Sequence, residues 1–226
     1  MTAGVVGAAA ARGALGLAGL LVTASGCAIA ERPLRAPAND QATVLLVTGG
    51  LGHPIEAIAR HPWFAVRPAG ATRWQVWEVG GGGETDDPFD NDPYVDPILH
   101  GVWRGAEAER AIACLAREAP PWLEALHYRL WPGPNSNTFG DVMLRRCDLH
   151  ASLPATSIGK DWRGWAGASW TTEGTGVQVE VAGFGVRVGL REGVEVHVLG
   201  LAFGVDLWPP ALIVPLAGGR LGFADR

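Results

Sequence analysis

Residues 174–215 read GTGVQVEVAGFGVRVGLREGVEVHVLGLAFGVDLWPPALIVP, and this stretch decides the fold class. Three segments within it alternate valine with a polar residue at every second position. A period of two is typical of β-strands, because successive side chains point to opposite faces of a sheet. Short connections such as Arg191-Glu192-Gly193 favour tight turns between the strands. The pattern therefore predicts an antiparallel, glycine-rich β-meander over about residues 174–216.

The polar positions of the meander also have a predicted orientation. Glu195 and His197 lie two residues apart, so they share one face of their strand. We expect this face to meet solvent and the valines to face the protein interior. The pattern leaves open whether the meander forms a second small sheet or extends the first one.

The chain before the meander predicts an antiparallel sheet with a few packed helices. Segments 42–48, 63–67 and 73–79 are rich in β-branched and aromatic residues, as strands are. Residues 105–119 have apolar positions at helical spacing, and we expect Pro120-Pro121 to end that helix. A second helix is expected over 139–146, after a segment (122–130) that reads as a strand or short helix. The fold class is α+β with a C-terminal meander.

The N-terminus predicts export from the cytoplasm. Residues 1–26 contain no acidic residue and a single basic one, with an apolar stretch of small residues. This is the pattern of a signal peptide. It ends in Ala24-Ser25-Gly26-Cys27, which resembles a bacterial lipobox, although Ala24 stands where leucine is usual. Lipidation of Cys27 would hold the protein at a membrane; cleavage at Ala28-Ile29-Ala30, giving a secreted protein, is the alternative.

These features predict the organisation and the compartment of the chain. Residues 1–26 are the signal peptide, 27–41 the lipidated N-terminus and tether, and 42–226 a single globular domain. By analogy with lipoproteins, the residue after Cys27 favours the outer membrane, with the domain facing the periplasm. The net charge of −5 argues against nucleic acid as a partner. The expected partners are the membrane, peptidoglycan or another envelope protein.

Cysteines and acidic residues were considered as metal ligands. Cys114 and Cys147 follow the predicted leader, and their spacing does not settle whether they pair. The acidic stretch 80–97 does not have the ligand spacing of an EF-hand, so we expect a solvated loop. No other ligand spacing suggests a metal site, and nothing in the sequence predicts a cofactor.

Two features of the composition stand out. The chain contains ten tryptophans, which suit stacking on sugar rings as well as packing in a core. Every basic residue except Lys160 is arginine. Because an ammonium group is more compact than a guanidinium, Lys160 is a candidate site residue; a salt bridge with a nearby carboxylate is the alternative.

The turn WPGPNSNTF (131–139) carries the strongest catalytic hypothesis. Its prolines and glycine stiffen a bend, and Asn135, Ser136 and Asn137 are all favourable at a helix N-cap. A helix N-terminus stabilises an anion, whether a deprotonated nucleophile or an oxyanion. Ser136 is therefore a candidate nucleophile, with Asn135 or Asn137 as oxyanion or substrate contacts. A purely structural turn is the alternative.

A base is needed for this chemistry, and two residues are candidates. His61 precedes one predicted strand, and Gln75 or Glu78 on the next strand would orient its imidazole. Lys160 is the alternative base, because Ser/Lys dyads exist. The order of His, polar strand residue and nucleophile resembles that of circularly permuted papain-like proteins related to the NlpC/P60 group. Those proteins carry cysteine where this chain has Ser136.

Three segments together resemble a bacterial family of uncharacterised proteins. They are WPGPNSNTF, LPATSIGKDW (153–162) and GVEVHVLGLAFGVDLWPPALIVPLAGGRLGF (193–223). The chain resembles the domain of unknown function 3750 family over roughly residues 61–223. The resemblance implies an envelope protein and implies no particular reaction.

Two classes of function follow. The first is a papain-like hydrolase or acyl transferase acting on an amide or ester of the cell envelope, with Ser136 as nucleophile and His61 or Lys160 as base. The second is a non-enzymatic envelope lipoprotein that binds a glycan or a protein through tryptophan-lined surface and the meander.

Overall fold

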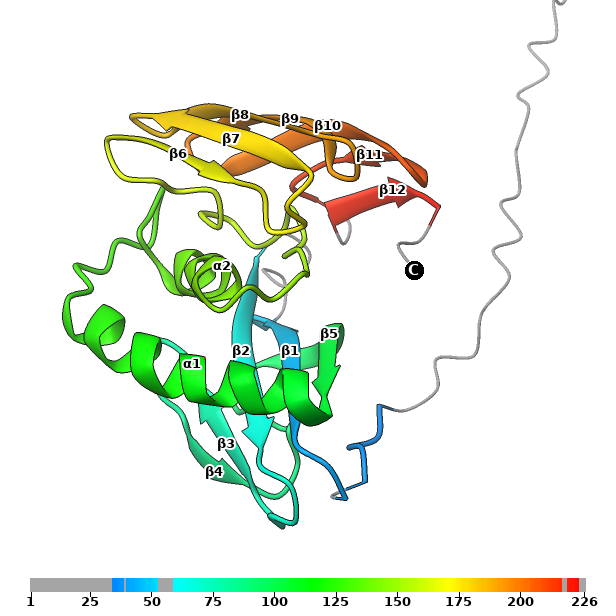
Figure 1. Cartoon of the computed structure of the whole chain (residues 1–226). Coiled ribbons are helices and arrows are strands. Elements are labelled where there is room, and N and C mark those ends of the chain that lie inside the picture. The colour runs from blue at the N-terminus through cyan, green and yellow to red at the C-terminus, as the bar shows by residue number, and fades with distance from the viewer. Residues whose placement is uncertain (1–33, 39, 53–58, 217–218, 224–226) are drawn as a thin grey trace, which may run out of the picture. The chain divides into compact units, whose positions relative to one another are not determined.

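The computed structural model describes residues 34–38, 40–52, 59–216 and 219–223, all of which belong to the unit Leu34–Arg226. The predicted signal peptide and Cys27 lie outside the described residues. The described residues form two antiparallel sheets and two helices (Figure 1). The predicted α+β class with a C-terminal meander is confirmed. None of the helices in the described part is long and apolar enough to cross a membrane.

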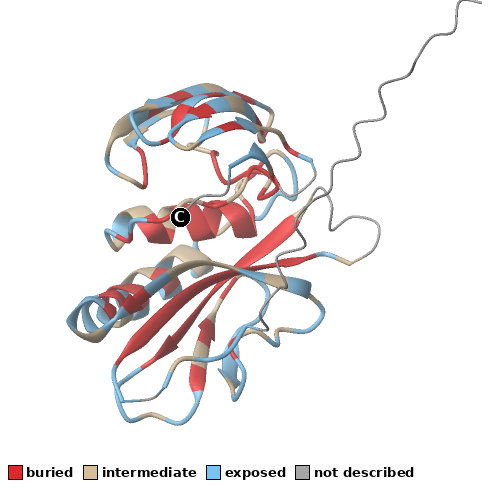
Figure 2. Ribbon diagram, turned by 90° about the vertical axis from the view of Figure 1, so that its right-hand side faces the viewer, coloured by how far each residue is buried: buried red, intermediate tan, exposed pale blue. Residues whose placement is uncertain are grey.

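The first sheet has five strands in the order β4-β3-β2-β1-β5. Its strands are β1 (Thr43–Gly50), β2 (Arg60–Arg67), β3 (Trp74–Trp77), β4 (Gly83–Thr85) and β5 (Val95–Arg104). All residues of β1 and β2 are buried, because both faces of these central strands are covered (Figure 2). β2 begins earlier than expected, so His61 lies within the strand. The long β5 was not predicted from the sequence.

The two faces of this sheet support separate cores. Phe64 and Val66 of β2 face the helices and share a core with Phe139 and Leu115. Trp63 and Ala65 face the opposite side, where they pack with Trp74 and Val76 among other residues. This alternation follows from the pleat of a strand. It also decides which side of the sheet His61 and Pro62 reach.

The helices are α1 (Gly105–Glu124) and α2 (Ser136–Arg146). α1 runs through Pro120-Pro121, so the prediction that these prolines end the helix is wrong. A proline pair removes two backbone donors, but the extra turn brings Trp122 against Phe139, with ring centroids 5.4 Å apart. The burial of Trp122 at this contact offsets the lost hydrogen bonds.

A disulfide bond joins the two helices. Cys114 of α1 pairs with Cys147, which caps the C-terminus of α2. The question that the spacing left open is thus answered, since the helices bring the two Cα atoms to 5.6 Å.

The second sheet contains seven strands in sequential order from β6 to β12. They are β6 (Ala166–Trp170), β7 (Gly176–Val181), β8 (Phe184–Gly189), β9 (Gly193–Val198), β10 (Leu201–Leu207), β11 (Pro210–Ile213) and β12 (Arg220–Gly222). The meander is therefore a separate sheet, longer than predicted at both ends. Figures 1 and 2 both show α2 on the side of this sheet that faces the first sheet.

Candidate functional site

The second sheet has its polar face inside and its apolar face outside. Glu195 and His197 are buried, together with Gln178, Glu180 and Arg187 on neighbouring strands. The prediction that Glu195 and His197 face solvent is wrong. Alternation along a strand shows which residues share a face, but the tertiary packing decides which face is covered. Here α2 and residues 153–163 cover the polar one.

Strand register assembles the polar side chains into two rows. In the first row Gln178 lies opposite Arg187, which lies opposite Glu195. In the second row Gly185 lies between Glu180 and His197.

Across Gly185, the imidazole Nδ1 of His197 lies 2.7 Å from Glu180 Oε1. A Cβ at residue 185 would lie 2.6 Å from the Glu180 carboxyl carbon, so only glycine leaves room for this contact.

Lys160 and Asp161 lie in the segment that connects α2 to β6, and their side chains lie near those of the two rows. The Lys160 ammonium lies 2.7 Å from Asp161 Oδ2 and 3.6 Å from Glu195 Oε2. His197 Nε2 lies 3.6 Å from one oxygen of each of the same two carboxylates. Arg187 also forms an ion pair with Glu195. We call Lys160, Asp161, Glu180, Arg187, Glu195 and His197 the ionic cluster.

The positive charges of the ionic cluster favour the ionised forms of Asp161 and Glu195. Burial alone would raise the pKa of Asp161, but the positive charges of Lys160, His197 and Arg187 hold it well below its usual range. Burial likewise opposes ionisation of Glu195, yet Lys160 and Arg187 lower its pKa to about 2.

His197 is stabilised in its charged form by the same carboxylates. Burial lowers the pKa of His197, but the nearby Asp161, the hydrogen bond to Glu180 and the Glu195 carboxylate outweigh burial and raise it. With His197 protonated, the cluster balances three positive against three negative side chains. This balance of charge allows so many charged side chains to be buried together.

A metal ion was considered at this position. Within the described part of the chain, Asp161, Glu195 and His197 are the group whose ligand atoms converge, all within 4.8 Å of one another. The Lys160 ammonium already contacts the Asp161 carboxylate and lies near that of Glu195. A divalent cation would have to displace that ammonium, so we assign these side chains to ion pairing.

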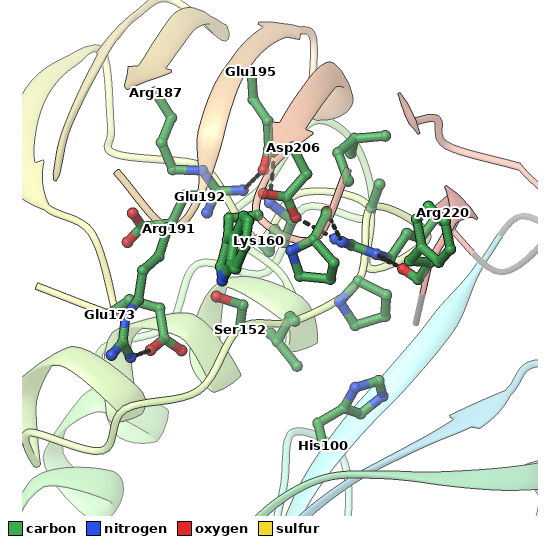
Figure 3. A pocket seen from close by; sticks show the side chains of 18 of the residues that line it. His100, Ser152, Lys160, Glu173, Arg187, Arg191, Glu192, Glu195, Asp206 and Arg220 are labelled. Atoms are coloured by element: carbon green, nitrogen blue, oxygen red, sulfur yellow. Dashed lines mark hydrogen bonds and ion pairs between the residues drawn. The ribbon is translucent and has the colours of Figure 1, made fainter. Parts of the chain in front are cut away.

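A cavity of about 1150 Å³ opens beside the ionic cluster. Lys160, Arg187 and Glu195 line it on the side of the second sheet, and His100 of β5 lines the opposite side (Figure 3). His100 Nε2 lies 2.8 Å from Thr48 Oγ1. Burial, aided by the nearby Arg60, lowers the pKa of His100 to about 4, so this imidazole is neutral near pH 7.

Two carboxylates around the cavity have an oxygen without a hydrogen bond. They are Glu192 and Asp206, each with one such buried oxygen among the described residues. Trp208 also lines the cavity and is 80% exposed. A buried acceptor without a donor is costly, so these oxygens mark a place where a ligand can supply hydrogen bonds.

The predicted catalytic residues are distributed over both faces of the first sheet. His61 Nε2 lies 2.8 Å from Glu78 Oε2, and the imidazole stacks on Tyr94 with ring centroids 4.0 Å apart. Gln75 instead donates to the backbone carbonyl of Val76. Of the two residues expected to orient the imidazole, Glu78 is therefore the one in contact with it.

Ser136 is the first residue of α2, as expected, but it is not bonded to either candidate base. The structure gives no hydrogen bond from its hydroxyl to His61 or to Lys160. α2 packs against Pro62, since a Cβ at Gly140 of α2 would lie 3.1 Å from the proline ring. His61 is the neighbour of Pro62 in the strand, so its side chain points to the other face of the sheet.

Asn135 and Asn137 tie the start of α2 to the segment that carries Lys160. Asn135 caps the helix by accepting from the backbone N–H groups of Asn137 and Thr138. Both asparagine side chains donate to the carbonyl of Ile158 at 2.9 Å. Thr138 Oγ1 donates to the carbonyl of Gly159 at 2.7 Å. The turn at 131–139 and the IGKD segment therefore form one unit, and this unit positions Lys160.

The interpretation of the sequence missed half of the ionic cluster. Asp161, Glu180 and Arg187 were not singled out. Glu180 and Arg187 are polar residues that alternate with valines in the meander, and Asp161 directly follows Lys160. One signal was available: opposite charges on adjacent meander strands, such as Arg187 and Glu195, pair if the strands form a hairpin. The acidic loop does not contribute, since Asp86 pairs with Arg73 and Asp87 accepts from the backbone of Phe89.

Comparison with known proteins identifies the family. No curated protein and no solved structure shows a significant match to the chain. The family model described as "Protein of unknown function (DUF3750)" matches residues 42–162. The match includes both helices, the Asn135–Asn137 cap and Lys160, and it ends before the second sheet. The chain belongs to the DUF3750 family.

Proposed function

We propose that this protein is a non-enzymatic binding protein of the bacterial cell envelope, and that its ligand is a glycan held in the cavity beside the ionic cluster. The observation that carries the proposal is that Glu192 and Asp206 each have a carboxylate oxygen without a hydrogen bond in the cavity lining, which also includes the exposed ring of Trp208. Sugar hydroxyls donate hydrogen bonds to carboxylates, and the apolar face of a sugar ring stacks on an indole.

The predicted lipid on Cys27 would place this site at the membrane, on the periplasmic side of the outer membrane in our proposal. The support is the lipobox-like sequence that ends the predicted signal peptide. A lipid-sized mass increase on the peptide that begins at Cys27 is the expected result. An unmodified peptide that begins after Ala30 would instead indicate a secreted protein.

Replacing Trp208 with alanine is expected to weaken glycan binding about tenfold, for a stacking contact worth about 1.4 kcal/mol. The measurement is co-sedimentation of the full chain with purified peptidoglycan sacculi over a range of concentrations. Trp165→Ala is the matched control, because Trp165 is 71% exposed and does not line the cavity. Equal binding by wild type and both variants would remove the cavity from the proposal, and no binding by the wild type would remove peptidoglycan as the ligand.

A papain-like hydrolase or acyl transferase is the second candidate function. It is favoured by the His61–Glu78 contact, since an imidazole oriented by a carboxylate is part of a catalytic triad. The position of Ser136 at the N-terminus of α2 favours it as well. Against it, the Ser136 hydroxyl has no hydrogen bond to a base, and a serine needs one to become nucleophilic.

For this reason we expect a fluorophosphonate probe to label the full chain no more than it labels a Ser136→Ala variant. Labelling is read after gel electrophoresis, with intact folding of the variant checked by circular dichroism. His61→Ala distinguishes the two candidate bases, because the substitution abolishes a reaction that uses His61 and spares one that uses Lys160. Strong labelling of the wild type that both substitutions abolish would establish the hydrolase and overturn the binding-only proposal.

A further inference from the structure

The outer face of the second sheet is apolar over its whole width. Its exposed large side chains carry no charge, and their exposed fractions range from 37% to 70%. They are Trp170, Val177, Val179, Val181, Phe184, Val186, Val188, Val194, Val196, Val198, Phe203, Val205, Leu207, Leu212 and Leu221. We call these fifteen side chains the valine face. Their strand neighbours form the buried polar face, so the apolar side is turned away from the rest of the unit.

Strand register makes the valine face continuous. One row of directly opposed residues crosses all seven strands, from β6 to β12. It consists of Trp170, Val177, Val188, Val194, Val205, Leu212 and Leu221. Opposed residues in an antiparallel pair project on the same side with Cβ atoms about 5 Å apart. The valine face is therefore a contiguous surface.

The size of this surface exceeds what a monomer usually exposes. Fifteen side chains exposed to about half their area leave on the order of 1,000 Å² of apolar surface in water. The largest apolar patch on a typical monomer is about 300–600 Å², whereas a stable interface buries about 800 Å² on each partner. The valine face is large enough to form a stable interface by itself.

A second copy of the chain fits this surface best. We propose that two copies pack their valine faces together, sheet against sheet, with a twofold axis between them. β-Branched side chains on two facing sheets interdigitate at a spacing of about 10 Å, as they do inside a β-sandwich. A twofold contact needs only one self-complementary patch, and an uncharged face meets its own copy without repulsion.

A membrane surface suits the face less well. The protein is acidic, with a net charge of −5, and the valine face carries no lysine or arginine to contact anionic lipid. The dimer is independent of glycan binding, because the cavity is lined by the opposite, polar face of the sheet. Packing through the valine faces leaves both cavities open.

Val196 provides the test because it lies in β9, the middle strand of the seven, within a central row of the face. A twofold axis near this point brings Val196 of one copy close to Val196 of the other. A Val196→Cys variant of the protein, treated in membranes with a short bismaleimide, is expected to give a species of about twice the mass of the same chain without cross-linker. Cys114 and Cys147 are paired and do not react.

Val95→Cys is the matched control, since Val95 is a valine of the first sheet with 42% exposure, close to the 50% of Val196. We expect little cross-linking from Val95→Cys, and loss of cross-linking when Val186→Asp is added to Val196→Cys. Equal cross-linking of the two single variants would overturn the dimer. Labelling of Val196→Cys by a bilayer-embedded photoreactive lipid, without a cross-linked species, would overturn it in favour of a membrane-facing sheet.

Discussion

Replacing Lys160 with methionine is expected to lower the free energy of unfolding by about 3–5 kcal/mol. The variant removes the ammonium that contacts Asp161 and lies near Glu195, and both carboxylates stay buried without it. Leaving a buried charge uncompensated costs far more than losing an exposed ion pair. The measurement is urea unfolding at pH 7, followed by circular dichroism.

Arg191→Met is the control for this substitution. Arg191 forms an ion pair with Glu173, but its side chain is 71% exposed. An exposed pair contributes about 0–1 kcal/mol, so this variant should unfold close to the wild type. Equal destabilisation by both substitutions would contradict the special role of Lys160.

The pH dependence of the destabilisation by Lys160→Met distinguishes the loss of the ammonium charge from a loss of packing. In the wild type, the lowered pKa values of Asp161 and Glu195 stabilise the fold above the unfolded-state pKa of about 4. That contribution disappears as the pH falls through the folded-state values. In the Lys160→Met variant, fewer positive charges oppose the effect of burial, so the pKa values of Asp161 and Glu195 in the folded state rise. Protonation of these two carboxyl groups at low pH therefore stabilises the folded variant. The difference in free energy of unfolding between the wild type and Lys160→Met should therefore decrease from pH 7 to pH 4. A difference that does not change with pH would indicate a packing defect.

Removing the Cys114–Cys147 disulfide is expected to cost about 3–4 kcal/mol, because the bond closes a loop across a sequence separation of 33 residues. The double variant Cys114→Ala/Cys147→Ala should show this loss in urea unfolding under non-reducing conditions. A reductant should destabilise the wild type by a similar amount and leave the double variant unchanged. If the wild type kept its free energy of unfolding after both cysteines had been fully reduced, the bond would have no stabilising role.

The elements that the sequence predicted well depend on local interactions. Alternating valines predicted the meander strands, because the period of two is a property of each strand by itself. Asn135 was expected near a helix start, and it caps α2 through its own side chain. β5 and the extension of α1 through Pro120-Pro121 were missed. Both depend on contacts distant in sequence, such as the pairing of β5 with β1 and the packing of Trp122 on Phe139.

The candidate site was predicted less well, since it depends on the orientation of whole strands. His61 and Pro62 are neighbours, and the pleat sends one towards Tyr94 and the other towards α2. If the side chains of β2 pointed to the opposite faces of the sheet, as a shift by one residue would cause, His61 would lie beside α2. The order of residues along the chain, which resembles that of permuted papain-like proteins, does not show to which face each side chain points. Among the described residues, Ser136 has no hydrogen bond to His61 or to Lys160.

Lys160 was singled out from the composition, but its partners were not foreseen. Composition showed that it is the sole lysine, while its salt bridge was one of two alternatives. The structure selects the salt bridge and shows how it is made. Asn135 and Asn137 hold Ile158 by hydrogen bonds, and the segment after Ile158 carries Lys160 into the second sheet.

The amino-acid sequence by itself determined the strands of the meander and the capped start of α2. It also determined that the valines lie on one face of the meander and the charged residues on the other. These are short-range properties of a chain with defined backbone geometry. Only the tertiary structure decided that the charged face turns inward and the valine face outward. That choice depends on whether distant residues such as Lys160 and Asp161 can neutralise Glu195 and Arg187, because charges are buried only where they are paired.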